Sequence, residues 1–309
     1  MRRLKFLSLT AVIICLLGAC NPSPVQEDST IQTAQSAQYL TGWQEKDGQQ
    51  VYILEDGSLA TGWLESDGKR YYFDQSGILQ TGWLEMDGST YYLSAQGCAV
   101  TGEAEIDGKV YHFTSQGQRV LLVNPWNALP ADYQPELVRL SDSISSKEIF
   151  VEKSCLAALE KMIADCNSQC PSVCVISGHR TNDYQKGLYN RKVNYYLEQG
   201  YSEADAKIEA AKVVAVPGTS EHQLGLAVDI IDTRSWSLTE IQETLPAQQW
   251  LMKNCWRYGF ILRYPKDKTK ETGIIYEPWH YRYVGESLAK ELYDSGLTLE
   301  EYLQSLTAQ

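Results

Sequence analysis

Apolar residues follow three different spacings along this chain of 309 residues. A mostly apolar run covers residues 6–17, directly after three basic residues near the N-terminus. Over residues 38–120, short aromatic and β-branched runs alternate with glycine turns every twenty residues, which predicts β-hairpins. From residue 121 onward, apolar residues at helical spacing alternate irregularly with short apolar runs, which predicts mixed helices and strands. The pattern therefore predicts a leader, an all-β repeat region and an α+β domain, in that order.

The leader predicts export from the cytoplasm. A basic start and a short apolar run precede Leu17-Gly18-Ala19-Cys20, and the run is shorter than the ~20 residues that span a bilayer. These four residues resemble the lipobox of bacterial lipoproteins. The resemblance implies a signal peptide over 1–19 and a lipid on Cys20 that anchors the chain to the membrane; an ordinary signal with an incidental Cys20 is the alternative. Residues 20–37 are polar and predict a flexible tether.

The twenty-residue period in 38–120 predicts four hairpins. Thr-Gly pairs at 41–42, 61–62, 81–82 and 101–102 are each followed by an Asp-Gly pair. Asp-Gly favours the type I′ turn, which needs positive φ at both central positions. One short hairpin is barely stable alone, so the four units are expected to stack into a small solenoid.

Regular aromatic residues accompany these turns. They are Trp43, Trp63, Trp83, Tyr52, Tyr72 and Tyr92. The repeats resemble cell-wall-binding repeats of the choline- and glucan-binding type, which implies wall polysaccharide or teichoic acid as partner and a cation held between aromatic faces. The position before each tyrosine pair, often Trp in that family, is Gln50, Arg70 or Thr90 here, so one wall of the aromatic cage is missing, which disfavours choline as the ligand. The alternative is that the aromatic residues only pack against each other.

Residues 121–309 predict one α+β domain. The spacing predicts helices over 143–165, 183–198, 202–213 and 246–258, and strands over 171–176, 225–231 and 260–264. The strands and helices do not alternate regularly, which disfavours a doubly wound parallel sheet.

Candidate chemistry is concentrated in two short stretches of this domain. His222, Asp229 and His280 supply two nitrogen ligands and one oxygen ligand, a set that leaves one position open on a catalytic zinc ion. Glu277 could then take and return the proton of an attacking water. The helical His-Glu-x-x-His pattern is absent from the sequence, which excludes that metalloprotease class. Each residue alone has an ordinary structural explanation, so the prediction depends on the combination.

Three motifs carry a family resemblance. Ser-x-His-x-x-Gly-x-Ala-x-Asp at 220–229, Glu-x-Trp-His at 277–280 and Ser-Gly-x-Arg at 177–180 resemble the zinc D-alanyl-D-alanine carboxypeptidases of the VanY type. The resemblance implies the fold of the hedgehog and D-Ala-D-Ala peptidase group and one Zn²⁺ ion. It assigns zinc binding to His222, Asp229 and His280, general base catalysis to Glu277, stabilisation of the carbonyl or substrate carboxylate to Arg180, and peptide binding to Arg180, Gln185 and Ser220. His179 replaces the usual aromatic residue of Ser-Gly-Tyr-Arg and is expected to support the ligands without being a fourth one.

The net charge disfavours one class of binding partner, and the cysteine spacing disfavours a second zinc site and a catalytic thiol. The net charge of −12 and pI of about 4.9 disfavour a nucleic-acid partner, which needs clustered Lys and Arg. Eight cysteines include Cys20, and Cys166, Cys170 and Cys174 recur at intervals of four. Intervals of four differ from the usual cysteine pairs of zinc sites, and no cysteine lies in a recognisable nucleophile setting. Free or disulfide-bonded structural cysteines are therefore expected.

The sequence therefore predicts a lipid-anchored enzyme on the outer face of the bacterial membrane, facing the wall. Its expected reaction is D,D-carboxypeptidase release of the terminal D-alanine from peptidoglycan stem pentapeptides during wall remodelling. Three alternatives remain open: L,D-cleavage of stem tetrapeptides, endopeptidase cleavage of cross-bridges, and a wall-binding lipoprotein that has lost activity. Retention of all three ligands and Glu277 argues against the last.

Overall fold

A computed structural model describes residues 40–86, 89–130, 133–170 and 172–307. The predicted signal peptide 1–19, the lipidation site Cys20 and the tether 20–37 lie outside the described residues. The chain divides into the units Met1–Leu40 and Thr41–Gln309, and the description below concerns the second unit. Within the described ranges, every helix is too short or too polar to cross a membrane.

The repeat region consists of antiparallel hairpins, as predicted. The pairs are β1 (Gly42–Lys46) with β2 (Gln49–Ile53), β3 (Gly62–Ser66) with β4 (Lys69–Phe73), β5 (Gly82–Met86) with β6 (Ser89–Leu93), and β7 (Gly102–Ile106) with β8 (Lys109–Phe113), which also pairs with β9 (Arg119–Val120). At the first turn, Asp47 and Gly48 have φ of 54° and 77°, and the turns at 67–68 and 107–108 match it. Asp-Gly therefore places positive φ where a type I′ turn requires it.

Neighbouring hairpins are joined by backbone hydrogen bonds and aromatic contacts. The amide of Leu79 donates to the carbonyl of Gln50 at 2.9 Å, which links two successive units. The Trp43 ring lies 4.7 Å from the Tyr71 ring of the next unit, and Trp63 with Tyr91 and Trp83 with Tyr111 repeat this contact at 4.9 Å. Each hairpin thus buries aromatic surface against its neighbour, which a lone hairpin could not do.

The second part of the fold is built on a four-stranded antiparallel sheet. Its order is β12 (Val173–Ser177), β13 (Ala227–Asp232), β15 (His280–Tyr283) and β14 (Phe260–Leu262). A separate pair joins β10 (Leu137–Arg139) to β11 (Phe150–Glu152). Side chains of β13 alternate between two faces, and Val228 and Ile230 enter the main hydrophobic core.

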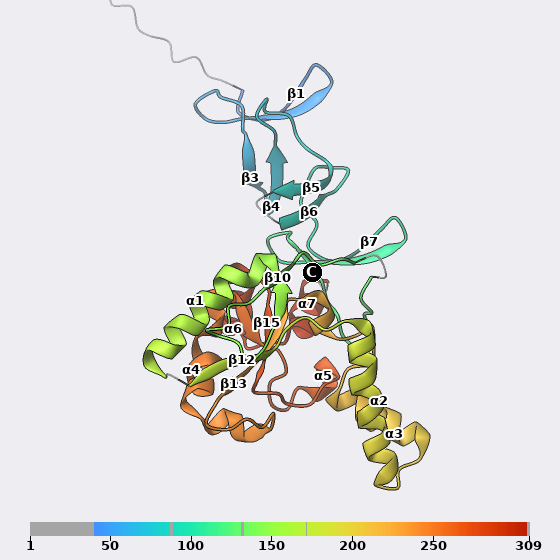
Figure 1. The fold of residues 1–309 in the computed structure, drawn as a ribbon. Helices are drawn as coiled ribbons and strands as arrows, with labels where there is room; N and C mark the ends of the chain where they lie inside the picture. Colours follow the sequence, from blue (N-terminus) through green and yellow to red (C-terminus); the bar gives the residue numbers. More distant parts are fainter. Residues whose placement is uncertain (1–39, 87–88, 131–132, 171, 308–309) are drawn as a thin grey trace, which may run out of the picture. The chain divides into compact units, whose positions relative to one another are not determined.

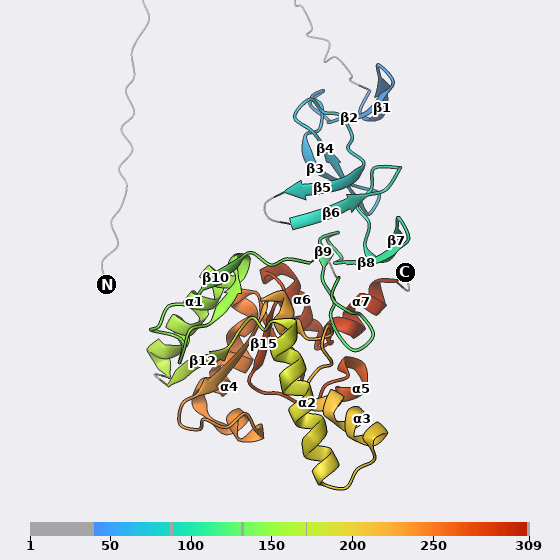
Figure 2. The same cartoon turned by 45° about the vertical axis from the view of Figure 1, so that its right-hand side comes forward.

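Helices α1 (Lys153–Gln169) and α4 (Pro246–Asn254) pack against that core face through Leu159, Met162 and Leu251. Helices α2 (Asn182–Glu198) and α3 (Glu203–Val213) lie side by side in both views (Figures 1 and 2). The remaining elements are the 3₁₀ helices η1 (Glu221–Leu224), η2 (Glu240–Thr244) and η3 (Cys255–Tyr258), and the α-helices α5 (Thr269–Thr272), α6 (Glu286–Ser295) and α7 (Leu299–Thr307).

The sequence prediction differs from the structure in the start of one helix and in several elements that it missed. The predicted helix over 143–165 begins only at Lys153, because residues 150–152 form a strand with 137–139 and the Glu152 side chain accepts the Ser154 amide at the helix start. The amphipathic helices α6 and α7 were not predicted at all. The α+β class itself is confirmed, and the other predicted helices and strands fall within a few residues of the observed ones.

Candidate active site

Adjacent strands place Asp229 and His280 beside each other. Asp229 of β13 is the register partner of His280 of β15. Their neighbours Val228 and Tyr281 pair as well and enter the hydrophobic core. Since successive side chains of a strand point to opposite faces, Asp229 and His280 share the face away from that core.

A tight turn brings His222 to the same place. Gly225 ends η1 with φ of 75°, and a Cβ there would lie 2.9 Å from the Glu152 backbone nitrogen. Only glycine meets both the positive φ and the close approach without strain. Nδ1 of the His222 ring lies 2.8 Å from the Gly178 carbonyl oxygen and donates to it, which leaves Nε2 as the free ligand atom.

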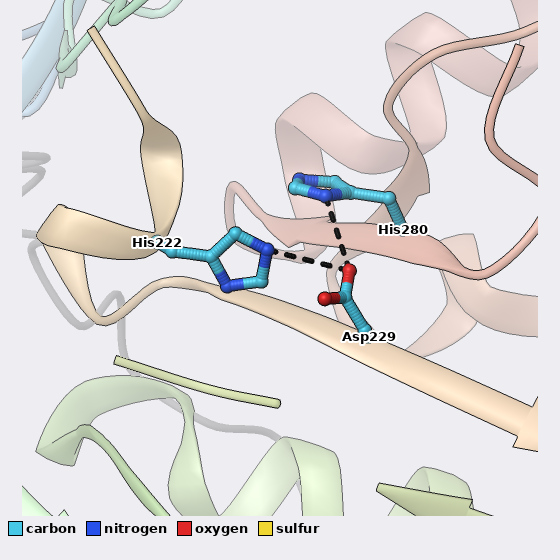
Figure 3. Close-up of side chains that lie close together, drawn as sticks. All are labelled: His222, Asp229 and His280. Atoms are coloured by element: carbon cyan, nitrogen blue, oxygen red, sulfur yellow. Dashed lines mark ion pairs between the residues drawn. The ribbon is translucent and has the colours of Figure 1, made fainter. Parts of the chain in front are cut away.

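The three side chains converge on one point, as Figure 3 shows. Asp229 Oδ1 lies 3.3 Å from His222 Nε2 and 3.3 Å from His280 Nδ1. All three residues are buried, and their ligand atoms lie within 4.8 Å of one another. Asp229 Oδ1 is also a buried oxygen with no hydrogen-bond donor among the described residues. Two imidazoles and a carboxylate around an unsatisfied oxygen fit a zinc ion well.

Glu277 stands next to this cluster. Its Oε2 lies 3.5 Å from His280 Nδ1, and Pro278 keeps the segment out of a helix, so β15 starts directly at His280. Burial and the negative charge of Asp229 raise the pKa of Glu277 to about 7. A carboxylate with a pKa near neutrality can both accept and return a proton.

The surrounding charges act in opposite directions on the two imidazoles. Burial lowers the pKa of His222 to about 4, assisted by the positive charge of Arg180. Burial also opposes protonation of His280, but the nearby carboxylates of Asp229, Glu221 and Glu277 raise its pKa to about 9. Negative charge therefore exceeds positive charge around His280, which favours a bound cation.

Arg180 connects Asp229 to Ser177, the last residue of strand β12. Its Nη2 donates to Asp229 Oδ2 at 2.5 Å and its Nε donates to Ser177 Oγ at 3.1 Å. His222 and Arg180 together hold the pKa of Asp229 well below its usual range, although burial opposes this. A guanidinium has five N–H donors, so Arg180 keeps others for a ligand in the cavity that it lines.

The cluster opens into a cavity of about 280 Å³, whose lining includes Gln185 and Ser220. Gln185 is 1 % exposed; its Nε2 donates to the Ala215 carbonyl, and its Oε1 is buried without a donor among the described residues. The structure brings all seven candidate residues of this domain together around one cavity. The sequence analysis missed Lys192, Tyr264 and Trp279, which also line it; no motif marks Lys192 or Tyr264, whereas Trp279 stands inside the Glu-x-Trp-His motif.

His179 and the cysteines stay outside the cluster. His179 is half-buried and belongs to no metal-binding group found among the described residues. Six cysteines fall in the described ranges, and all are free thiols: Cys98, Cys155, Cys166, Cys170, Cys174 and Cys255. Burial raises the pKa of Cys155 and of Cys255 to about 12, which disfavours a nucleophilic thiolate.

The repeat aromatics differ from one unit to the next. The Arg70 guanidinium carbon lies 4.3 Å from the Trp63 ring centroid, and Arg119 lies 4.9 Å from the Tyr111 ring. Trp43 contacts Tyr71 and Phe73 and has no cation over its ring among the described residues. Arginines of the chain itself therefore lie over the Trp63 and Tyr111 rings, and Arg119 also lies 5.9 Å from the Trp83 ring centroid.

An α+β domain with two imidazoles, a carboxylate and a nearby glutamate in one cavity defines a metal-dependent hydrolase. Comparison with known proteins makes this specific. Residues 148–286 match the family model VanY, D-alanyl-D-alanine carboxypeptidase, and residues 40–81 and 60–97 match the choline-binding repeat. A D-alanyl-D-alanine carboxypeptidase of Enterococcus faecalis is 44% identical over 187 residues, which are 60% of this chain and 66% of that protein.

Two solved structures are similar to the same part of the chain. The crystal structure of a mutant of the vancomycin resistance D,D-pentapeptidase VanY, in complex with Zn(II), is 43% identical with a TM-score of 0.52 and covers 59% of this chain and 97% of that one. The LD-carboxypeptidase LdcB is 33% identical with a TM-score of 0.54 and covers 67% of this chain and 94% of that one. The chain belongs to the VanY family of D-alanyl-D-alanine carboxypeptidases. The predicted family, the α+β peptidase fold and the zinc cofactor are thereby confirmed.

Proposed function

We propose that this chain is a zinc D,D-carboxypeptidase that releases the terminal D-alanine from peptidoglycan stem pentapeptides. The observation that carries the proposal is the position of Asp229 Oδ1, 3.3 Å from one nitrogen of each histidine and unsatisfied by any described donor. The similarity to a D-alanyl-D-alanine carboxypeptidase and to a D,D-pentapeptidase supports the choice of bond.

His222 Nε2, Asp229 Oδ1 and His280 Nδ1 would hold the zinc ion. A zinc ion held there supplies a Lewis acid that polarises the scissile carbonyl and makes water a stronger nucleophile. Glu277 Oε2 takes the proton of the attacking water and returns it to the departing D-alanine amine, for which its pKa of about 7 is suited.

Residues on the cavity wall hold the peptide end. The spare N–H groups of Arg180 offset negative charge on the carbonyl oxygen or the terminal carboxylate. The unsatisfied Oε1 of Gln185 accepts a peptide N–H, and Ser220, buried at the entry to η1, offers a hydroxyl. Because these groups are already ordered, binding costs little conformational entropy.

The test incubates the full zinc-loaded chain with stem tetrapeptides and pentapeptides and follows the products by mass spectrometry. The proposal expects loss of one alanine from the pentapeptide, with an intact tetrapeptide. Cleavage of the tetrapeptide alone would instead assign L,D-carboxypeptidase activity, the second candidate, which the similarity to LdcB favours. The Glu277→Gln variant is the control for contaminating peptidases.

We further propose that the repeats bind wall polysaccharide or teichoic acid and not choline. The guanidinium of Arg70 already covers the Trp63 face where a quaternary ammonium would stack. Sedimentation with purified walls should remove the chain from solution, and excess choline should not release it. Retention that survives removal of teichoic acid identifies the polysaccharide as ligand; release by choline would contradict the proposal.

We also propose that a lipid on Cys20 anchors the chain to the outer face of the membrane, with the repeats and the peptidase facing the wall. The Leu17-Gly18-Ala19-Cys20 sequence supports this. Labelling of cells with a radioactive fatty acid should mark the wild-type chain and leave Cys20→Ala unlabelled. Equal labelling of both chains would contradict the proposal.

A further inference from the structure

Glu221 is a fully buried carboxylate next to the metal-binding group of His222, Asp229 and His280. It has no role in the proposed mechanism. It is 1 % exposed and begins η1, one residue before His222. Its Oε1 lies 2.8 Å from Arg263 Nε and 3.0 Å from Arg282 Nη1, and both guanidiniums are also buried. A buried carboxylate needs such partners, since an unpaired charge in the interior is costly.

The other oxygen of Glu221 faces a metal-binding imidazole. Oε2 lies 3.7 Å from Nε2 of His280. Both atoms are buried, and neither has a hydrogen-bond partner in the part of the chain that is described. The opposite nitrogen of the same ring, Nδ1, faces Asp229 at 3.3 Å. A movement of a few tenths of an ångström would turn the first contact into a hydrogen bond from Nε2–H to Oε2.

Two neighbouring strands of the sheet, β14 and β15, build this arrangement. His280 and Arg282 are two residues apart on β15 and share the face that points away from the hydrophobic core. Arg263 follows β14, and its amide donates to the His280 carbonyl at 3.2 Å. Its guanidinium then pairs with both oxygens of Glu300 on α7. Glu221 is therefore fixed by groups that do not line the cavity.

We propose that Glu221 is a positioning residue that holds His280 with its proton on Nε2 and its Nδ1 turned to the metal. Metal-binding histidines commonly donate their second N–H to a carboxylate, which fixes both tautomer and ring orientation. The proposal rests on the metal site of the proposed function. Arg263 and Arg282 occupy Oε1, so Oε2 is left to accept from the imidazole.

A glutamine cannot fill both roles of Glu221. If the amide oxygen faced the two arginines, the amide NH₂ would meet the Nε2–H of His280, and two donors would oppose each other. If the amide turned over, the NH₂ would meet the guanidiniums instead. Glu221→Gln therefore keeps the volume of the side chain but removes the acceptor from one partner.

The test measures zinc affinity by competition with a chromogenic chelator on the full-length chain. Glu221→Gln should bind zinc about 10- to 100-fold more weakly than wild type. Glu203→Gln, which changes an exposed glutamate on α3, should bind zinc as wild type does. A lower melting temperature with unchanged zinc affinity would overturn the proposal and leave Glu221 with a structural role only.

A second measurement needs no variant and covers the case in which Glu221→Gln does not fold. Nitrogen-15 NMR of the histidine-labelled, zinc-loaded wild-type chain should show His280 with a slowly exchanging proton on Nε2. A rapidly exchanging Nε2 proton, or zinc on Nε2, would overturn the proposal. Neither measurement requires peptide cleavage, so a chain that binds zinc in this way but cleaves no stem peptide would contradict the proposed function and leave this inference intact.

Discussion

The Nδ1 atom of His280 lies 3.3 Å from Asp229 and 3.5 Å from Glu277, so one imidazole nitrogen faces both a metal ligand and the proposed base. The two carboxylates can have different roles because their surroundings differ. Asp229 accepts from Arg180 and has a pKa well below its usual range, whereas burial raises the pKa of Glu277 to about 7. Asp229 is thus a permanent anion and Glu277 a carboxylate that exchanges protons near neutral pH.

Replacement of the base should separate catalysis from metal binding. Glu277→Gln keeps the size of the side chain but removes its ability to take a proton, so kcat should fall about 10²- to 10⁴-fold. Zinc content by elemental analysis should stay at one ion per chain. Glu240→Gln, an exposed glutamate on η2, is the matched control. A Glu277→Gln chain with wild-type kcat would remove Glu277 from the mechanism.

Zinc binding should release a proton from His280. In the metal-free chain its pKa is about 9, so the ring is protonated below that pH and zinc must displace the proton. Affinity should therefore rise with pH and level off above about 9. Calorimetry in buffers of different ionisation enthalpy near pH 8, where Glu277 with its pKa of about 7 is already ionised, should count about one proton. A count of zero would contradict a protonated His280 in the metal-free chain.

Gln185 should affect substrate binding more than chemistry. Removal of its unsatisfied Oε1 in Gln185→Ala deletes one hydrogen bond to the peptide, worth about 1 kcal/mol, and should raise KM roughly fivefold. The rate at saturating peptide should change little. Gln199→Ala, at the exposed end of α2, serves as the control. An unchanged KM would show that Gln185 holds only the Ala215 carbonyl.

Removal of Arg70 should create a choline site. Arg70→Ala uncovers the Trp63 face, and a cation–π contact there is worth about 0.5–2 kcal/mol. The variant should be retained longer than wild type on immobilised choline. Arg70→Lys keeps a cation near the ring and should behave as wild type. Equal retention of all three chains would mean that Arg70 does not decide the ligand.

Local signals explain which features the sequence predicts. The Asp-Gly pairs determine the hairpin turns through backbone conformation alone. His222, Asp229 and His280 lie in two short sequence motifs that can be recognised without the fold. The role of Glu221 could not be read in this way. Its partners Arg263 and Arg282 are about 40 and 60 residues away in the sequence, and only the sheet brings them together. The start of α1 was misplaced for the same reason, since the strand before it pairs with residues 137–139.

The central claim is that one zinc ion, held by His222, Asp229 and His280, is required for D-alanine release. The most direct test removes metal from the full chain with a chelator and titrates zinc back while D-alanine release from a stem pentapeptide is measured. The metal-free chain should release no D-alanine, and one equivalent of zinc should restore full activity. Release that is insensitive to metal removal would contradict it.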